Sequence, residues 1–177
     1  MTDTQFRQVQ LVLLDVDGVL TAGEIIYDDS GQQLKIFNVK DGIGIRLLRE
    51  AGIGVGIITG RTGKALRHRC ENLGIDLLFD GVKHKEKILD QISASTGIAT
   101  TAMAFVGDDL PDLPIMKRVG LAVAVGDAHE MVRRIAQFVT RAPGGRGAVR
   151  EISEILLKAQ GKWDALVERL FDGTPNP

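Results

Sequence analysis

The stretch Leu11-Val-Leu-Leu-Asp15-Val-Asp17-Gly18-Val-Leu-Thr21 decides the fold of this chain and points to its chemistry. An apolar run without alternating polar residues is typical of a central strand of a parallel sheet, covered on both faces. Ligands of such sheets bind beyond the carboxyl ends of the strands, where Asp15 and Asp17 stand. Residues two apart on an extended chain point the same way, so the two carboxylates repel each other unless a cation such as Mg²⁺ neutralises them. By itself, Asp-x-Asp-Gly is equally compatible with a polar turn that ends a strand.

Short apolar runs and amphipathic stretches alternate along the rest of the chain. This alternation predicts an α/β fold, a Rossmann-like and mostly parallel sheet with helices on both faces. With 177 residues, we expect a single domain over 1–177. The expected strands cover residues 9–14, 54–58, 77–79, 103–106, 121–125 and 138–139. The expected helices cover residues 43–50, 64–73, 86–96, 113–119 and 130–136.

Two segments depart from this alternation. Residues 24–38 read as two short strands around an Asp-Asp-Ser-Gly turn, which predicts a β-hairpin flap inserted directly after the first strand. Residues 144–177 form a C-terminal tail, with amphipathic helical spacing over 148–159. The Gly-Gly-Arg-Gly run at 144–147 is expected to be the most flexible interior segment.

Composition excludes several classes of protein. The net charge of −1 and the 5% aromatic content do not suit a nucleic-acid-binding surface. One cysteine, Cys70, cannot form a disulfide framework and is typical of a reducing compartment. No apolar run approaches the ~18 residues of a membrane span, and the N-terminus does not resemble a signal peptide. We therefore expect a cytoplasmic protein without a nucleic-acid or membrane partner.

Polar residues follow two more of the expected strands. Thr59-Gly60-Arg61 comes after residues 54–58, and a hydroxyl with backbone N–H groups at a strand end can hold phosphate oxygens. Arg61 can add a bidentate contact to a phosphate or carboxylate. Gly107-Asp108-Asp109-Leu-Pro-Asp112 places three acids together, which is costly unless a cation lies among them. A Thr-capped turn and helix caps are the plainer alternatives, although caps explain only one or two of the aspartates.

In their order along the chain, Asp15-x-Asp17-Gly, Thr59-Gly-Arg, a lysine and Gly107-Asp-Asp-x-x-Asp112 resemble the four motifs of the haloacid dehalogenase superfamily of phosphohydrolases. Residues 37–45 and 140–151 extend the resemblance over almost the whole chain. They are similar to a branch without a cap domain, the 3-deoxy-D-manno-octulosonate 8-phosphate phosphatases of lipopolysaccharide biosynthesis. The lysine motif is the weakest match, and its spacing favours Lys85 over Lys83.

The resemblance implies a role for each motif residue. Asp15 is the expected nucleophile, which becomes an aspartyl-phosphate, and Asp17 the general acid and base. Lys85 is expected to stabilise the transferring phosphoryl group, oriented by Asp112. The residues expected to hold Mg²⁺ are Asp15, Asp17 (also through its backbone carbonyl), Asp108 and, as an auxiliary acid, Asp109. The residues expected to bind phosphoryl oxygens are Thr59 and Gly60.

The implied substrate is a phosphorylated keto-deoxy sugar acid, whose carboxylate suits arginine. Arg61 and Arg146 are the candidates for that contact. Arg67, Arg69 and Arg141 are held in reserve. The resemblance also implies a homotetramer whose hairpins associate centrally and whose glycine-rich tail reaches a neighbouring site.

Two other functions remain open from the sequence. The first is the same chemistry on a nine-carbon keto-deoxy sugar 9-phosphate, although members of that branch tend to replace the arginine that Arg61 represents. The second is a non-catalytic assembly domain, in which the nucleophile or the acid is often lost. Asp15 and Asp17 are both present here.

Overall fold

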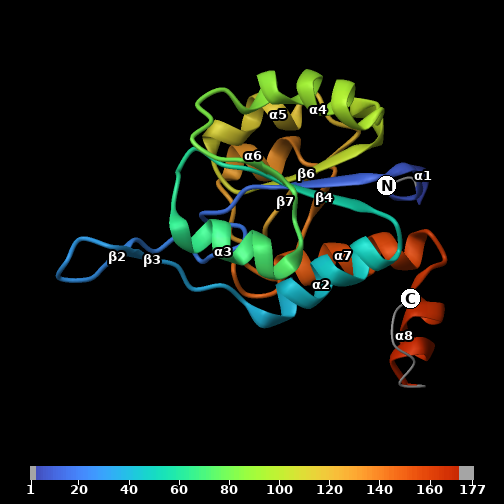
Figure 1. The fold of residues 1–177 in the computed structure, drawn as a ribbon. Helices are drawn as coiled ribbons and strands as arrows, with labels where there is room; N and C mark the ends of the chain where they lie inside the picture. Colours follow the sequence, from blue (N-terminus) through green and yellow to red (C-terminus); the bar gives the residue numbers. More distant parts are fainter. Residues whose placement is uncertain (1–2, 172–177) are drawn as a thin grey trace.

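A six-stranded sheet forms the centre of the molecule (Figure 1). The computed structural model describes residues 3–171. The strands follow the order β5-β4-β1-β6-β7-β8, and every neighbouring pair is parallel, which confirms the predicted sheet. Their bounds are β1 Leu11–Leu14, β4 Gly54–Ile58, β5 Leu77–Phe79, β6 Met103–Gly107, β7 Leu121–Ala124 and β8 Phe138–Val139.

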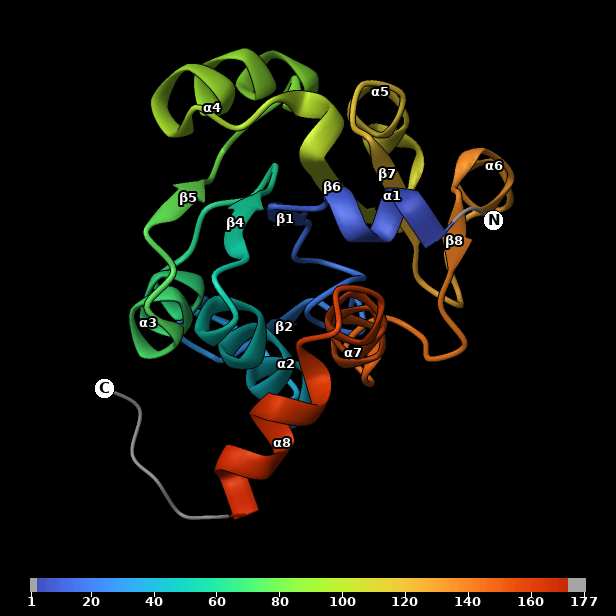
Figure 2. The ribbon, with the colours of Figure 1, turned by 90° about the vertical axis from the view of Figure 1, so that its right-hand side faces the viewer.

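Helices cover both faces of the sheet, as predicted. One face carries α4 (Ile88–Thr96), α5 (Leu113–Met116) and α6 (Glu130–Ile135), and the other carries α2 (Val39–Glu50), α3 (Lys64–Leu73) and α7 (Ala148–Ala159) (Figures 1 and 2). The remaining described helices are α1 Asp3–Gln8, α8 Trp163–Phe171 and the short 3-10 turns η1 Lys85–Lys87, η2 Thr100–Ala102 and η3 Leu110–Asp112. None of the described helices is long and apolar enough to cross a membrane.

The helices differ from the predicted bounds in several places, and a cap explains the early start of α2. Helix α2 begins at Val39, four residues before the predicted start, because the Asn38 side chain accepts a hydrogen bond from the backbone N–H of Lys40 (2.8 Å). The helix predicted over 86–96 begins instead as the 3-10 turn η1. Helix α1 was not predicted, because its six residues are too few to show a clear helical period.

Strand β1 lies at the middle of the sheet because its residues are apolar on both faces. All four are fully buried, and β1 pairs in register with β4 on one side and β6 on the other. Each buried leucine contributes roughly 1.5–3 kcal/mol of transfer free energy. Since β1, β4 and β6 are adjacent and parallel, their carboxyl ends meet at one edge of the sheet.

The predicted flap is present as a two-stranded hairpin, β2 (Ile26–Tyr27) with β3 (Gln33–Leu34). It projects from the edge of the sheet where β1 ends (Figure 1). The Asp28 carboxylate closes its turn by accepting hydrogen bonds from the backbone N–H groups of Ser30 and Gln32 (2.9 and 2.8 Å). The hairpin and its flanks expose the large apolar side chains Ile25, Ile26, Tyr27, Leu34 and Ile36.

The 144–147 run is held in place, so the expectation that it is the most flexible interior segment was wrong. Gly144 is buried, and a Cβ there would come within 1.6 Å of the Gly18 carbonyl oxygen. The backbone N–H of Gly145 donates to the Val19 carbonyl (2.8 Å). Glycine is needed in this run for close approach of two backbones rather than for flexibility. Of the expected tail, residues 172–177 lie outside the described residues.

Helix α7 takes its N-terminal cap from a distant residue. Its own N-cap, Gly147, has no side chain, and the buried carboxylate of Asp41 on α2 accepts hydrogen bonds from the backbone N–H groups of Gly147 (3.2 Å) and Arg150 (2.8 Å). Burial raises the pKa of Asp41, against the effect of these hydrogen bonds. Asp41 therefore joins α2, the 144–147 run and α7.

Replacing Asp41 by alanine should lower the free energy of unfolding by about 2 kcal/mol, because the first N–H groups of α7 lose their partner in a buried place. Urea denaturation followed by circular dichroism measures this change. Asp76→Ala, at an exposed aspartate, is the matched control and should leave the midpoint unchanged. Equal midpoints for the two variants would contradict the capping role of Asp41.

Candidate active site

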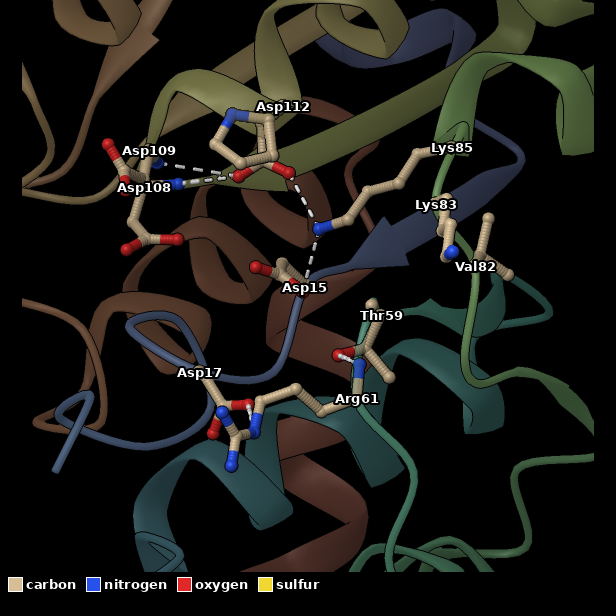
Figure 3. A pocket seen from close by; sticks show the side chains of 12 residues that line it. Asp15, Asp17, Thr59, Arg61, Val82, Lys83, Lys85, Asp108, Asp109 and Asp112 are labelled. Carbon is tan, nitrogen blue, oxygen red and sulfur yellow. Dashed lines mark hydrogen bonds and ion pairs between the residues drawn. The ribbon is translucent and has the colours of Figure 1, made fainter. Parts of the chain in front are cut away.

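The carboxyl ends of β1, β4 and β6 surround a cavity of about 380 Å³ (Figure 3). It is bordered by the aspartates that follow β1 and β6, the residues that follow β4, and the segment leading into η1. Its lining residues include Asp15, Asp17, Thr59, Gly60, Arg61, Lys83, Lys85, Asp108, Asp109 and Asp112. All the predicted site residues except Arg146 therefore meet at this one place.

Asp15 stands at the bottom of the cavity. Its backbone N–H continues the sheet by donating to the Val106 carbonyl (3.1 Å), so the strand fixes its position. Burial raises the pKa of its carboxyl to about 6; the charge of Lys85 opposes this rise and that of Asp112 adds to it. A carboxylate held by the sheet and removed from water is suited to act as a nucleophile.

Lys85 lies between two of the carboxylates. Its Nζ is 2.8 Å from Asp15 Oδ1 and 2.7 Å from Asp112 Oδ1, and the residue is 5% exposed. Burial lowers the pKa of Lys85, but the charges of Asp15 and Asp112 outweigh it and raise the pKa above its usual value. Lys85 is thus a fixed cation beside Asp15, while Lys83 is exposed at the cavity.

Asp112 is oriented by the backbone that follows β6. Its Oδ2 accepts a hydrogen bond from the Asp108 N–H (3.0 Å), and its Oδ1 accepts from Lys85. Gly107 is required here because a Cβ would come within 2.5–2.8 Å of the Asp112 side chain. The glycine before the two aspartates therefore allows Asp112 to fold back towards the strand end.

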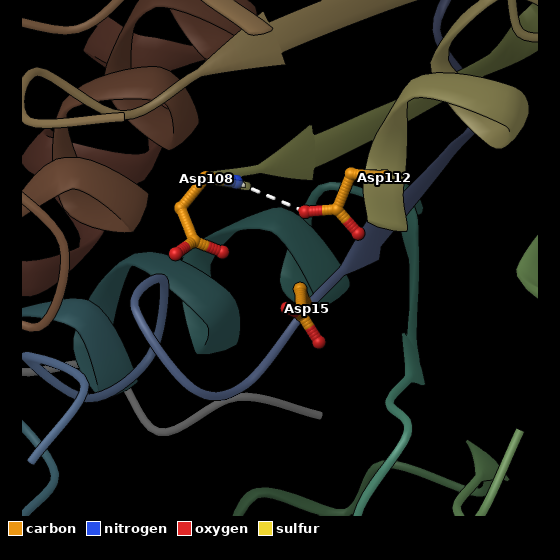
Figure 4. Close-up of side chains that lie close together, drawn as sticks. All are labelled: Asp15, Asp108 and Asp112. Atoms are coloured by element: carbon orange, nitrogen blue, oxygen red, sulfur yellow. Dashed lines mark hydrogen bonds between the residues drawn. The ribbon is translucent and has the colours of Figure 1, made fainter. Parts of the chain in front are cut away.

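Three carboxylates gather where a cation would fit. Asp15, Asp108 and Asp112 each offer an oxygen, and these atoms lie within 4.8 Å of one another (Figure 4). Burial raises the pKa of Asp108 to about 8, and the charges of Asp15, Asp112 and then Asp109 add to this rise. Crowded carboxylate oxygens, one of them costly to ionise without a positive neighbour, suit a hard divalent cation such as Mg²⁺.

Two acids expected at the metal lie outside this group of three. The exposed Asp109 caps η3, because its Oδ1 accepts from the Leu110 N–H (2.8 Å). The Asp17 side chain forms an ion pair with Lys35 of the flap, and its Oδ2 lies 3.8 Å from Arg61 Nε. Asp112, expected only to orient Lys85, is the third member of the group.

Thr59 and Gly60 face the cavity from the end of β4. Thr59 is 2% exposed, and its backbone is fixed because its N–H donates to the Phe79 carbonyl (2.9 Å) while its carbonyl accepts from the Val82 N–H (3.0 Å). A Cβ at Gly60 would make only an ordinary contact with the Val82 carbonyl, at 3.6 Å. The Thr59 Oγ1 accepts a long hydrogen bond from the Arg61 N–H (3.4 Å), and the hydroxyl proton and the Gly60 N–H can be donated to anionic oxygens.

The other candidate arginines lie elsewhere. Arg67 pairs with Asp80 (2.8 Å), and Arg69 stacks on Phe37 and donates to the Asn38 carbonyl (3.2 Å). Arg141 and Arg146 border a separate hollow beside α7. Of the five arginines considered for the substrate carboxylate, Arg61 alone lines the cavity.

Lys35 is the site residue that sequence reasoning missed. It lies on the flap, 18 residues after Asp17 and outside the four motifs, and its only signal was a lysine within an otherwise apolar strand flank. A contact between the flap and Asp17 depends on how the hairpin folds over the strand end, which no local pattern encodes.

The sequence of this chain is similar to those of known proteins. Residues 78–152 match the family of haloacid dehalogenase-like hydrolases. The 3-deoxy-D-manno-octulosonate 8-phosphate phosphatase of Escherichia coli (strain K12) is 49% identical over 158 residues, 89% of this chain and 84% of that protein. The chain belongs to this phosphatase family.

Solved structures of the family have the same fold. The crystal structure of the Yersinia pestis phosphatase superposes with a TM-score of 0.90 at 43% identity, over 92% of this chain and 88% of that one. The Moraxella catarrhalis phosphatase, in complex with a magnesium ion, a phosphate ion and KDO, superposes with a TM-score of 0.92 at 36% identity, over 95% and 97% of the two chains.

Binding of Mg²⁺ should release a proton at pH 7, because Asp108, with its pKa near 8, must ionise to become a ligand. The affinity should rise from pH 6 to pH 8 by up to about tenfold per unit. Isothermal titration calorimetry in buffers of different ionisation enthalpy measures both effects. Asp108→Asn should abolish the proton release, and Asp109→Asn is the matched comparison. An equal loss of Mg²⁺ affinity in the two variants would show that Asp109 is a ligand as well.

Replacing Gly144 by alanine should lower kcat more than tenfold, since the new Cβ would push the Gly18 carbonyl and with it the loop that carries Asp17. Steady-state kinetics of phosphate release measures the effect on kcat, and thermal unfolding recorded in parallel checks that the variant is folded. Gly63→Ala is the control, because its backbone is extended and a Cβ there meets nothing within 4 Å. Wild-type kinetics for Gly144→Ala would show that the loop does not depend on this contact.

Proposed function

We propose that this protein hydrolyses 3-deoxy-D-manno-octulosonate 8-phosphate to the free sugar acid and phosphate, through an aspartyl-phosphate on Asp15. The observation that carries the proposal is the buried Asp15 carboxylate, fixed by the sheet and paired with Lys85 at 2.8 Å in a cavity lined by Thr59 and Asp17. The family supports the substrate, since its members are named for this sugar phosphate. The reaction belongs to lipopolysaccharide biosynthesis in the cytoplasm.

In the first step, an oxygen of Asp15 attacks the phosphorus and the bond to the sugar oxygen breaks. Asp17 donates a proton to that leaving oxygen, so the product departs as an alcohol. Thr59 and the Gly60 N–H hold the other phosphoryl oxygens, and Lys85 balances their charge. Asp15, Asp108 and the Asp17 carbonyl would hold Mg²⁺, since both oxygens of Asp112 already accept hydrogen bonds, from Lys85 and the Asp108 N–H. The cation would supply further positive charge to the phosphoryl group.

In the second step, water attacks the phosphorus of the aspartyl-phosphate. Asp17, now a carboxylate, takes a proton from this water, and the bond between phosphorus and the Asp15 oxygen breaks. Inorganic phosphate leaves, and both aspartates return to their starting states. Asp112 keeps Lys85 beside Asp15 throughout, through its 2.7 Å ion pair.

Release of phosphate from the eight-carbon substrate should require Mg²⁺ and should be lost in Asp15→Asn, which keeps the shape of the side chain but removes the nucleophile. A colorimetric phosphate assay measures this, with a nine-carbon keto-deoxy sugar 9-phosphate in parallel. Faster turnover of the nine-carbon substrate would replace the proposed substrate and keep the chemistry. A folded, cation-binding protein that turns over neither substrate would be the non-catalytic assembly domain.

The exposed apolar hairpin supports a homotetramer with the flaps at its centre. Tyr27 and Ile36 are 59% and 71% exposed, and they belong to a patch that also includes Ile25, Ile26 and Leu34. Such a patch is typical of a protein interface. Arg146, which does not line the cavity of its own chain, would then act on the substrate carboxylate of a neighbouring copy.

Tyr27→Glu combined with Ile36→Glu should convert the tetramer into smaller species, because two charges would be buried in the interface. Light scattering coupled to size-exclusion chromatography measures the mass. The KM for the sugar phosphate should rise if Arg146 acts between copies. Met131→Glu, at a large apolar side chain on α6 that is 43% exposed, is the matched control. A double variant with the mass of the wild type would exclude the hairpin as the interface.

A further inference from the structure

The flap delivers a buried lysine to the active site. Lys35 follows directly on β3, and only 4% of its side chain is exposed. The residues on either side, Leu34 and Ile36, are 51% and 71% exposed. Because successive side chains of an extended segment point to opposite faces, the flap turns its apolar residues outwards and Lys35 inwards. A lysine ammonium withdrawn from water in this way needs an anionic partner.

That partner is Asp17. Lys35 Nζ forms an ion pair and hydrogen bond with Asp17 Oδ1. The second oxygen, Oδ2, is buried and has no hydrogen-bond partner among the described residues, although it lies 3.8 Å from Arg61 Nε. The two oxygens of this carboxyl group are therefore unequal: Oδ1 is held by Lys35 of the flap, whereas Oδ2 has only the longer ion pair with Arg61, which Figure 3 shows beside it. Oδ2 can therefore still accept a hydrogen bond from a ligand in the cavity that Asp17 lines.

We propose that Lys35 is a positioning residue for the general acid and base of this reaction. By holding Oδ1, it fixes the Asp17 side chain so that Oδ2 is the atom that passes a proton to the leaving sugar oxygen and later takes one from water. This inference rests on the proposed function, and it adds the flap to the machinery that the four sequence motifs supply.

Substrates with different leaving groups distinguish a positioning role of Lys35 from a purely structural role. An alkoxide leaving group needs the proton from Asp17, whereas p-nitrophenolate is stable enough to leave without it. The ratio kcat/KM reports the steps up to departure of the leaving group. Loss of Lys35 should therefore lower kcat/KM for the sugar phosphate and spare it for p-nitrophenyl phosphate. In a variant without Lys35, attack of water on the aspartyl-phosphate would still be slowed, because Asp17 is the base in that step. A burst of p-nitrophenol should therefore precede slow turnover.

The experiment compares the full-length wild type with Lys35→Met, Lys35→Arg and Asp17→Asn, in Mg²⁺, on both substrates, with thermal unfolding recorded for each. Lys35→Met should lower kcat/KM for the sugar phosphate by about 10- to 100-fold, the range expected for a displaced catalytic group. The kcat/KM of Lys35→Met for p-nitrophenyl phosphate should change less than about threefold, since departure of p-nitrophenolate needs no proton. Lys35→Arg, which keeps the cation, should recover part of the loss. Lys117→Met, at an exposed lysine directly after α5, is the control for the chemical change.

A double-variant cycle gives the second test. If Lys35 acts through Asp17, adding Lys35→Met to Asp17→Asn should cost nothing further on the sugar phosphate. An equal fall of kcat/KM on both substrates, or fully additive losses in the double variant, would overturn the positioning role while the proposed function stood. A wild type that hydrolyses neither substrate would overturn the proposed function and this inference with it.

Discussion

The mutual repulsion of three crowded carboxylates, two buried and one half-buried, is the constraint on which the rest of this structure depends. Asp15, Asp108 and Asp112 bring their oxygens within 4.8 Å of one another, and among residues 3–171 Lys85 is the one ammonium paired with two of them. Burial raises the pKa values of Asp15 and Asp108, and the charges of the neighbouring aspartates add to the rise because one ammonium cannot neutralise three acids. A divalent cation and an anionic phosphoryl group complete this balance of charge, so the site is built for a reaction that brings both together.

Such a cluster is tolerated because the backbone around it is unusually well fixed. β1 ends at the centre of the sheet, and its loop packs against Gly144 and Gly145 at distances that exclude side chains. Asp41 in turn holds the end of that run and the start of α7. The free energy released by the apolar core and these contacts offsets the cost of keeping like charges close together.

The flap shows how one short hairpin can serve two purposes. Its outward residues are apolar and exposed, while Lys35 faces inwards to Asp17. Two strands of two residues each are only marginally stable by themselves, so contacts at either surface affect the whole hairpin. Assembly through the outward face would therefore also order the lysine that faces the active site.

The sequence by itself determined the sheet, the helices on both faces, the hairpin and the residues that meet at the strand ends. These features follow from local apolar patterns and from the rule that parallel strands end at one edge. Only the tertiary structure decided that the 144–147 run is packed, that Asp112 rather than Asp109 joins Asp15 and Asp108, and that Lys35 reaches Asp17. Each of these depends on contacts between segments far apart along the chain, where close approach and buried charge, rather than local propensity, select the arrangement.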